Sequence, residues 1–583
     1  MSDLHRSATI RRRPVPDAEG RFPDPLHPVL RRIFLSRGVR DAQEIDYSLA
    51  TLPPVERMKG MEAAVALLAD AVCEGRRMMV VADYDADGAT SCAVALRGLR
   101  ALGARPPDFV VPDRFRFGYG LTPEIVEVAA RHRPDLLITV DNGISSIQGI
   151  AAANRLGIPV VVTDHHLPGE ALPDAAAIVN PNQPGCPFPS KNLAGVGVMF
   201  YLLLGLRAAL RERGWFKAAT RPEPNLARLL DLVALGTVAD VVPLDRVNRV
   251  LVEQGLRRIR GGEASAGVRA LITVAGREAS RLVAGDLGFA LAPRLNAAGR
   301  LTEMGLGIRC LVSDSYEEAL AMATQLDELN RARRDIEQQM QQQAWSVLES
   351  LHLEQKRELP FGLCLYDPGW HQGVVGILAS RVKERVHRPV IAFAPGEAGE
   401  LKGSARSVPG LHMRDALDAI AVRHPGLLVK FGGHAMAAGL TLKPELYATF
   451  ERAFDEEVRR HLAADDLQGV IWSDGELSAE DMSRSFAEAV RRAAPWGQAF
   501  PEPVFDGLFD IIDRRVVGEK HLKLAVRRPG EARVFDAIWF NPPRPERIQS
   551  GQRATIAYRL DVNEYQGRAS LQLVVVGLQA KRG

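Results

Sequence analysis

The sequence lacks any apolar run long enough to span a bilayer. The basic residues Arg11 to Arg13 are followed by Pro14 and have no hydrophobic segment behind them, which excludes a secretory signal. The five cysteines lie far apart, without a Cys-x-x-Cys pair or a metal-ligand spacing. We therefore expect reduced, mostly buried thiols in a cytoplasmic protein that does not associate with membranes.

Neither sign of charge dominates the composition. Lys and Arg number 74 and Asp and Glu 71, which gives a net charge of +3. A nucleic-acid surface must therefore be a local patch and not a global excess of charge. The 583 residues include 46% hydrophobic and 25% charged side chains, as in ordinary soluble proteins. At about 150 residues per domain, this length predicts three or four domains.

Three aspartates alternate directly after a short apolar run. Met78 to Ala82 is predicted to be a strand buried on both faces of a parallel sheet, so Asp83, Asp85 and Asp87 follow its C-terminal end. Carboxylates this close repel one another unless a cation binds or their pKa values rise. Oxygen ligands suit Mg²⁺ or Mn²⁺. An EF-hand begins similarly, but its twelfth position would be Val94 and a helix should precede it. A solvated acidic turn is the other alternative.

Further aspartates and histidines also follow apolar runs. The runs are 136–140, 160–163 and 231–238, and the residues after them are Asp141, Asp164-His165-His166 and Asp240. Helical patterns alternate with the runs, which predicts an α/β fold with a parallel sheet. Ligands of such sheets gather outside the carboxyl ends of the strands, where the strand order reverses. We therefore predict that these side chains converge, although unrelated caps and turns remain an alternative. A structural, hydrogen-bonded histidine would explain either histidine singly but the adjacent pair less well.

The predicted cluster has enough ligands for two divalent ions, with Asp141 between them. Two such ions clamp the attacking and leaving oxygens of a phosphoryl group and generate hydroxide at neutral pH. Imidazole beside carboxylate shifts the preference from Mg²⁺ toward Mn²⁺. Phosphoester hydrolysis is the chemistry that this site predicts.

Residues 316–354 are nearly free of Gly and Pro, and their apolar spacing predicts one long amphipathic helix. The helix would serve as a spacer between domains or as a DNA-contacting arm. A strand, a helix and a strand are then predicted at 361–366, 374–386 and 389–393, which opens a second α/β domain.

The second domain contains two glycine-bearing segments, 403–407 and 431–439. A Gly-Gly turn at Gly432 and Gly433 lets backbone N–H groups approach a phosphate, to which Arg406 or His434 would add charge. An ordinary turn is the other interpretation.

The chain from about residue 504 changes to short alternating segments. They lie at 504–512, 522–526, 532–540, 554–560 and 570–576, which predicts a small barrel of the oligonucleotide-binding type. Basic residues including Lys520 and Lys523 interleave with Phe535, Trp539 and Phe540. A single strand needs such a mixture because its bases stack while its phosphates pair with cations. The aromatic residues equally suit a barrel core.

The motifs resemble those of a known superfamily. Asp83-x-Asp85-x-Asp87-Gly88, Val140-Asp141-Asn142-Gly143, Asp164-His165-His166 and Asp240 resemble the successive motifs of the DHH phosphoesterases, and 432–439 resembles their DHHA1 domain. With the long helix and the terminal barrel, the order resembles that of the bacterial RecJ family. The resemblance implies an N-terminal extension at 1–60 packed on the first domain, a DHH catalytic domain at 61–312, a linking helix at 313–358, a DHHA1 domain at 359–465 and an OB-type barrel domain at 466–583.

The resemblance implies a processive 5′→3′ exonuclease that releases mononucleotides from single-stranded DNA, uses two Mn²⁺ or Mg²⁺ ions and serves recombination and repair. Asp85 and Asp141 would hold one ion with Asp83 close by, and Asp87, Asp141, His165 and Asp240 would hold the other. Catalysis would depend on Asp85, Asp141 and His166, the last facing the scissile phosphate as charge stabiliser or acid. The implied DNA contacts are Arg294, Asn296, Arg300, Trp370, His371, Ser404, Arg406, Gly432, Gly433, His434, Lys520 and Lys523. Phe117-Gly118-Tyr119-Gly120 also resembles a family segment.

The family implies a single-strand-binding protein and a RecQ-type helicase as partners, and we expect a monomer. One alternative is a superfamily phosphoesterase that acts on short oligoribonucleotides, cyclic dinucleotides or pyrophosphate. Such enzymes are usually smaller, and the C-terminal barrel argues against them. A second alternative is a catalytically inactive DNA-binding scaffold. Relatives of that kind lose carboxylates, whereas every expected ligand is present here.

Overall fold

The computed structural model describes residues 9–16, 20–22, 26–113, 117, 119–217, 222–355, 359–396, 399–518, 521–542, 545–565 and 568–580. The chain forms two compact units. The first comprises the described part of Asp17–Arg331 with Arg491–Glu502, and the second comprises the described residues up to Pro16, Ala332–Val490 and those from Pro503 onward. None of the helices in these ranges is long and apolar enough to cross a membrane. All five cysteines are free thiols and only Cys73 is exposed, as predicted.

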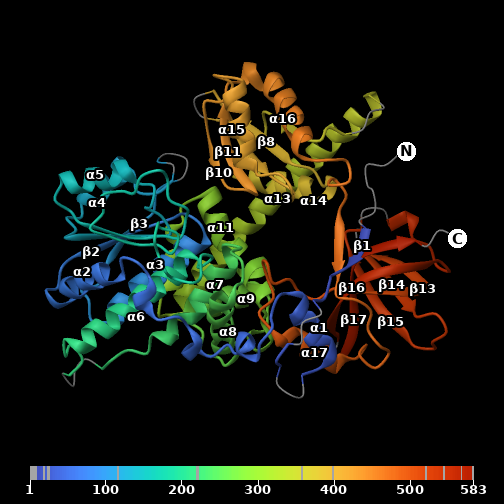
Figure 1. Ribbon diagram of the computed structural model, residues 1–583, viewed down its shortest axis with the longest axis horizontal. Helices are drawn as coiled ribbons and strands as arrows, with labels where there is room; N and C mark the ends of the chain where they lie inside the picture. Colours follow the sequence, from blue (N-terminus) through green and yellow to red (C-terminus); the bar gives the residue numbers. More distant parts are fainter. Residues whose placement is uncertain are drawn as a thin grey trace. The chain divides into compact units, whose positions relative to one another are not determined.

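A five-stranded parallel sheet lies at the centre of the first unit (Figure 1). Its strands are β2 (Met78–Ala82), β3 (Asp108–Val110), β4 (Leu136–Val140), β5 (Val160–Thr163) and β6 (Ala177–Val179), in the order β3-β2-β4-β5-β6. The chain moves from β2 to β3 on one side and then to β4 on the other, so the strand order reverses between β2 and β4. A ligand site is expected at the carboxyl ends there. The three strands predicted from the sequence are confirmed.

Helices cover both faces of this sheet. α4 (Pro123–Ala130) and α5 (Ile147–Arg155) share a hydrophobic core with β2, β4 and β5 on one face. α2 (Met61–Cys73), α3 (Ala86–Ala101) and α6 (Gly195–Glu212) lie on the other side in Figure 1. The remaining helices are α1 (Pro28–Ser36), α7 (Leu230–Ala239), α8 (Arg246–Arg260), α9 (Ala266–Val274), α10 (Ala284–Asp286), the π-helical turn η6 (Leu287–Leu291), α11 (Ala292–Leu301) and α12 (Gly305–Val312).

One apolar run differs from the prediction. Residues 231–238 were expected to end at the sheet edge like the neighbouring strands, but they lie in helix α7, and Asp240 is its C-terminal cap. Leu230 to Thr237 are all buried. A helix that is buried all round shows the same uninterrupted apolar run as a buried strand, so periodicity does not separate them.

The helix α13 (Tyr316–Gln355) is one continuous helix, as predicted, and it passes from the first unit at Arg331 into the second. The second unit contains a mixed sheet of order β10-β11-β9-β8-β7. Its strands are β7 (Leu363–Tyr366), β8 (Val390–Pro395), β9 (Leu401–Arg406), β10 (Lys430–Gly433) and β11 (Ala437–Leu442). α14 (Val375–Val386) packs with the second half of α13 on one face, and α15 (Met413–Arg423) and α16 (Tyr447–His461) pack on the other.

The Gly-Gly segment also differs from the prediction. Gly432 and Gly433 are the last residues of strand β10 and not a turn. The hairpin itself is formed by residues 434–436, and the N–H of His434 donates to Ala437 O over 2.8 Å. Gly433 has a φ of 148°, which turns the chain at that point.

The five predicted C-terminal strands are confirmed and form a closed barrel of order β13-β14-β15-β17-β16. They are β13 (Phe505–Val517), β14 (His521–Arg527), β15 (Val534–Phe540), β16 (Arg553–Tyr565) and β17 (Arg568–Ala580). Phe535 is buried in the barrel, whereas Phe540 is exposed. The aromatic residues of this region therefore divide between the core and the surface.

The N-terminal residues do not pack as one extension on the first domain. β1 (Thr9–Arg12) pairs in parallel with β12 (Val470–Ser473) in the second unit. Arg12 donates through Nε and Nη2 to the two carboxylate oxygens of Asp506, at 3.0 and 2.8 Å. This pairing joins strands from opposite ends of the chain, which local sequence patterns do not reveal.

Residues 491–502, expected within the barrel domain, belong to the first unit. They begin in the last turn of α17 (Arg484–Ala493), and beyond it Trp496 and Phe500 stack on each other at 5.2 Å and on Phe34 of α1. The guanidinium of Arg249 lies over the Phe500 ring at 4.3 Å. An aromatic cluster therefore fixes this segment to the catalytic unit.

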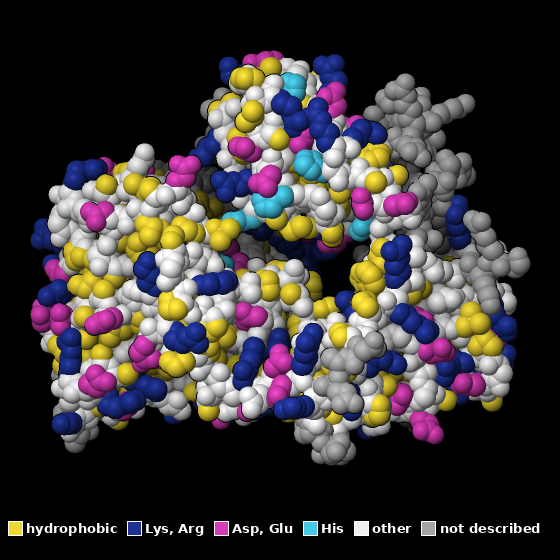
Figure 2. All heavy atoms as spheres, in the orientation of Figure 1, with side chains coloured by type: hydrophobic (Ala, Val, Ile, Leu, Met, Phe, Trp, Pro, Cys, Tyr) yellow, Lys and Arg dark blue, Asp and Glu magenta, His cyan; other side chains and the backbone are white. Residues whose placement is uncertain are grey.

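Basic and acidic side chains are interspersed on the face shown in Figure 2, and no large field of one sign covers it. This agrees with the balanced composition of the chain.

Candidate metal centre

The turn from β2 into α3 carries the three alternate aspartates. Asp83 follows the strand directly and is buried, and Asp87 is buried in the first turn of α3. Asp85 is the helix N-cap, and its Oδ1 accepts the N–H of Gly88 at 3.0 Å. A Cβ at Gly88 would lie 2.4 Å from Asp83 O. Only glycine therefore fits this turn.

Asp141 has a left-handed backbone with a φ of 62°. Its N–H donates to Thr163 O at 3.0 Å, and its carbonyl accepts the Tyr119 hydroxyl at 3.1 Å. The side-chain amide of Asn142 donates to Val81 O and Val140 O at 3.0 and 2.9 Å, which ties the ends of β2 and β4 together. The left-handed backbone of Asp141 costs energy in a non-glycine residue. It persists where the surroundings enforce it, typically at functional sites.

The carboxylate of Asp87 lies at the N-terminus of α6. It accepts the N–H groups of Gly195 and Val196 at 2.7 and 3.0 Å. These bonds and the helix dipole favour the charged form. Burial nevertheless raises the pKa of Asp87 to about 7, with a further contribution from the negative charge of Asp85. A bound cation would favour the ionised form of this carboxylate.

Asp164 orients the histidine pair. Its Oδ1 accepts the N–H groups of His165 and His166 and lies 2.8 Å from Nδ1 of His166. Burial alone would raise the pKa of Asp164, but the hydrogen bond and charge of His166 outweigh it and the pKa is lowered. Burial opposes protonation of His166, yet the hydrogen bond to Asp164 and the surrounding carboxylates raise its pKa to about 9.

The structure brings every predicted metal ligand together. The donor atoms form three overlapping groups, each within 4.8 Å: Asp83, Asp85 and Asp141; Asp87, His165 and Asp240; and Asp141, His165 and His166. Nε2 of His165 lies 3.2 Å from Asp141 Oδ1 and 3.4 Å from Asp240 Oδ2. Asp141 and His165 therefore connect the groups.

The charge of this cluster requires compensation. Burial raises the pKa values of Asp141 and Asp240 well above their usual range, and the charges of Asp87 and Asp85 add to this effect. Carboxylate oxygens with one or two imidazoles are donors suited to Mg²⁺ or Mn²⁺. The donor set and its overlap around Asp141 fit two divalent ions.

Tyr119, Asp164 and Asn142 take part in the site, but the sequence assigned them no role, although Asp164 was predicted to converge with the other ligands. The Tyr119 hydroxyl lies 3.1 Å from His166 Nδ1, and its ring contacts His166 edge to face at 5.6 Å. Burial of the phenol and the charge of Asp164 raise its pKa well above 10. The sequence signal for Asp164 was its place in the Asp-His-His motif. Tyr119 lies in a loop without periodicity, and only its family-like segment pointed to it.

Two residues predicted to contact DNA have other partners. Arg294 is only 7% exposed, pairs with Asp327 at 2.8 Å and donates to Ala290 O. Asn296 Oδ1 accepts the N–H of Ala86 at 2.8 Å and so helps to cap α3. Both side chains are therefore engaged in contacts within the protein. Arg300 is half-buried at the end of the same helix, α11.

The remaining predicted DNA contacts lie in the second unit. Gly432, Gly439 and Ser404 are direct neighbours across β10, β11 and β9, and a Cβ at either glycine would meet open space. Nη1 of Arg406 donates to Ser404 Oγ at 3.1 Å, and Gly433 and His434 lie where β10 turns into the hairpin. We call Gly432, Gly439, Ser404 and Arg406 the glycine shelf.

Trp370 is buried and donates through Nε1 to Gln343 at 2.9 Å. Its ring is therefore packed inside the protein and does not present a face to DNA. His371 Nδ1 accepts the N–H of Gly373 at 3.1 Å. Lys523 on the barrel lies 3.5 Å from Asp536. Lys520 lies outside the described residues.

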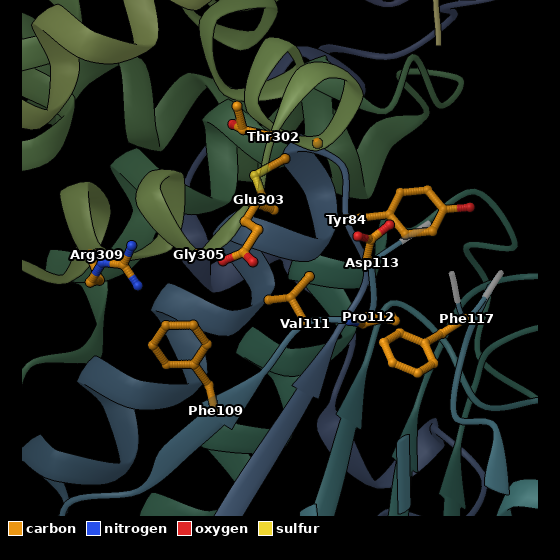
Figure 3. Close-up of a pocket in the computed structure, with 12 residues that line it drawn as sticks. Tyr84, Phe109, Val111, Pro112, Asp113, Phe117, Thr302, Glu303, Gly305 and Arg309 are labelled. Atoms are coloured by element: carbon orange, nitrogen blue, oxygen red, sulfur yellow. The ribbon is translucent and has the colours of Figure 1, made fainter. Parts of the chain in front are cut away.

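A cavity of about 230 Å³ adjoins the metal centre at Tyr84. Figure 3 shows Tyr84, Asp113 and Phe117 on one side and Phe109 and Arg309 on the other. None of the metal ligands lines this space. The cavity is therefore separate from the carboxylate cluster.

Models of protein families match three stretches of the chain. The DHH family N-terminal domain matches residues 77–237, the DHHA1 domain matches 360–460 and the RecJ OB domain matches 473–577. The matches fall on the parallel sheet, the mixed sheet and the barrel, respectively.

Similar proteins cover nearly the whole chain. It is 53% identical over 574 residues to the single-stranded-DNA-specific exonuclease RecJ of Escherichia coli (strain K12), which covers 98% of this chain and 99% of that protein. The corresponding protein of Dickeya dadantii (strain 3937) is 53% identical over 570 residues, with coverages of 97% and 98%. The crystal structure of RecJ in complex with Mn²⁺ from Thermus thermophilus matches with a TM-score of 0.78 at 31% identity, covering 96% of this chain and 76% of that one.

Proposed function

The chain belongs to the RecJ family of single-stranded-DNA-specific exonucleases, and from this premise we propose how its residues carry out the reaction. It is a metal-dependent exonuclease that acts on single-stranded DNA. We propose that it degrades the strand in the 5′→3′ direction, releases mononucleotides and serves recombination and repair. The observation that carries the proposed mechanism is the position of His165 Nε2, within 3.4 Å of both Asp141 and Asp240.

Asp83, Asp85 and Asp141 would hold one divalent ion, and Asp87, His165 and Asp240 would hold the other with Asp141 shared between them. Mn²⁺ or Mg²⁺ ions, when bound, clamp the attacking and leaving oxygens of a phosphodiester and supply hydroxide at neutral pH. Asn142 and the left-handed Asp141 backbone hold the ligands of β2 and β4 in register. This rigidity favours catalysis because the ligands need no rearrangement during reaction.

His166 would act on the scissile phosphate. Its Nδ1 faces Asp164 and Tyr119, and we propose that Nε2 meets the substrate. The hydrogen bond to Asp164 favours the protonated ring, which can stabilise negative charge and donate a proton to the leaving oxygen. Asp164 and Tyr119 are positioning residues in this account because they act through His166.

The glycine shelf in the second unit is proposed to receive the strand. Two neighbouring glycines without side chains allow the backbone of a ligand to approach the sheet closely. Arg406 is largely buried, which lowers its pKa while it stays positively charged, and it lies beside Ser404 Oγ. This combination suits a phosphate of the substrate. Gly433 and His434 would border the shelf, and Lys523 with the exposed Phe540 would contact the strand on the barrel.

We further propose a monomer in the cytoplasm that works with a single-strand-binding protein and a RecQ-type helicase, since its substrate must first be unwound. The proposed domains are the DHH domain at 61–312, the linking helix at 313–358, the DHHA1 domain at 359–465 and the barrel domain at 466–583, from which 491–502 returns to the first unit.

The proposal is tested by nucleotide release from single-stranded DNA labelled at either end, with a blunt duplex as control. Wild type with Mn²⁺ should release labelled mononucleotide from the 5′ label at the outset. His166→Ala and wild type in EDTA should be inactive. Early release from the 3′ label would show that degradation runs in the 3′→5′ direction. If DNA stays intact while dinucleotides are hydrolysed, the proposed metal centre is retained, but the assignment of single-stranded DNA as the substrate is wrong.

A further inference from the structure

Phe289 is the most exposed large apolar side chain among the described residues, at 86%. It lies in the π-helical turn η6, between α10 and α11. Leu287, Ala290 and Leu291 of the same turn are buried. The turn is thus anchored on both sides, and Phe289 alone of its large side chains is directed to solvent. π-Helical turns are rare and occur frequently at functional sites.

A second unusual apolar residue directly follows the metal ligand Asp240. Val241 has a φ of 61° and is 62% exposed. A left-handed backbone is a genuine outlier for a β-branched residue and costs about 1–3 kcal/mol. Burial of the Val241 side chain does not repay this cost, because the side chain is exposed. Function is the usual reason for such strain beside an active site.

The two residues belong to elements that pack together at the metal centre. A Cβ at Gly288 would lie 3.1 Å from Val238 Cγ1, so η6 contacts the last turn of α7. That helix ends in the ligand Asp240. On the other side, α11 begins directly after η6 and caps α3 through Asn296. Phe289 therefore lies on a turn that packs against the helix leading to Asp240 and Val241, and we call this part of the surface the rim of the metal centre.

We propose that Phe289 stacks on an unpaired nucleobase of the strand bound at the metal centre, with Val241 contributing apolar surface at the same rim. The inference rests on the proposed function and adds a residue that recognises the base. Carboxylates and cations of the site deal with phosphate, so the bases need an apolar partner. Aromatic stacking accepts every base because each has a π-face, and it favours unpaired bases because those of a duplex already stack on each other.

The test combines an enzyme variant with a substrate variant. Phe289→Ala, Phe289→Tyr and wild type degrade single-stranded DNA under steady-state conditions, and a parallel set of strands carries one abasic nucleotide at successive positions. Phe289→Ala should raise KM or lower kcat/KM by roughly 5- to 150-fold on the normal strand. Phe289→Tyr should stay close to wild type. At one abasic position the kcat/KM of wild type should fall by the same factor, whereas the kcat/KM of Phe289→Ala should fall no further.

Leu156→Ala is the matched control, because Leu156 is an exposed apolar residue beyond the C-terminal end of α5. It should behave as wild type throughout. If Phe289→Ala equals wild type on every strand, the inference is overturned while the exonuclease stands. If instead Phe289→Ala converts a wild-type dimer to a monomer on gel filtration without changing kcat/KM, a second copy of the chain occupies Phe289 and the inference also fails. If wild type does not degrade single-stranded DNA, the proposed function fails first.

Discussion

The hydroxyl oxygen of Tyr119 lies 3.1 Å from Nδ1 of His166, and the same hydroxyl donates to the carbonyl of Asp141 at 3.1 Å. One side chain thus contacts His166, which we propose to act on the scissile phosphate, and Asp141, which we propose to be shared by the two ions. The carboxylate of Asp164 contacts the same nitrogen of His166 at 2.8 Å. The orientation of His166 is therefore fixed by two partners.

Tyr119→Phe removes this hydroxyl and keeps the ring. Loss of a hydrogen bond to a charged group costs about 1.5–3 kcal/mol, so kcat should fall by roughly 10- to 150-fold while KM changes little. Tyr201→Phe is the control, since the buried Tyr201 hydroxyl has no hydrogen-bond partner among the described residues. Its steady-state constants should equal those of wild type. An undiminished kcat in Tyr119→Phe would show that Asp164 alone positions His166.

The metal-free protein should lose stability as the pH rises toward neutrality. Asp87 has a pKa of about 7 instead of 3.8, so between these values the folded state holds a proton that the unfolded state has lost. The free energy of unfolding then falls with rising pH, by at most about 4 kcal/mol from this group. Thermal unfolding between pH 5 and 8 measures it, and Asp87→Asn should reduce the dependence to the part that comes from Asp141 and Asp240. Mn²⁺ should raise Tm more at pH 8 than at pH 5, and an equal increase would contradict the account.

Substitutions in the glycine shelf should separate binding from folding. Gly439→Ala adds a methyl group that meets open space, so Tm should stay unchanged while KM for single-stranded DNA rises about tenfold or more, because the backbone of the strand can no longer approach. Gly433→Ala should instead lower Tm, since its Cβ would lie 2.5 Å from Ala437 O and its φ is 148°. A normal KM in Gly439→Ala would show that the glycine shelf does not contact single-stranded DNA.

Arg294→Met should destabilise the protein without weakening DNA binding. The variant leaves the buried carboxylate of Asp327 with the exposed Arg331 as its remaining partner at 2.6 Å. Breaking a buried pair in this way costs about 3 kcal/mol. The double variant Arg294→Met, Asp327→Leu should recover most of this loss in chemical denaturation. A raised KM at unchanged stability would instead support the DNA contact predicted from the sequence.

The sequence predicted that the carboxylates and His165 converge, because each lies close behind a buried apolar run. Met78 to Ala82 and Leu136 to Val140 end at neighbouring positions of one sheet edge, so their aspartates had to meet. Asp240 also joins the cluster although its run is helical, because α7 ends beside Asp87 and His165. The residue types and their order carried this information without any knowledge of tertiary contacts.

Other features depend on contacts that no local pattern encodes. The burial of Arg294 follows from Asp327, which lies on a different helix. The pairing of Thr9 to Arg12 with Val470 to Ser473 joins distant segments through backbone hydrogen bonds. Tyr119 lies in an irregular loop, and its role became visible only when the loop was placed beside His166. The contacts of Arg294, of Tyr119 and of the N-terminal strand therefore became known only from the structure, whereas the buried parallel strands were predicted from their apolar runs.

The stoichiometry of Mn²⁺ binding tests the central claim most directly. Wild-type protein titrated with Mn²⁺ and followed by electron paramagnetic resonance should bind two ions per chain, because two donor groups converge on Asp141. Asp141→Asn should bind at most one ion, and weakly, with its Tm at pH 5 close to that of wild type. A single ion in wild type, or two tightly bound ions in Asp141→Asn, would contradict a two-ion centre built around Asp141.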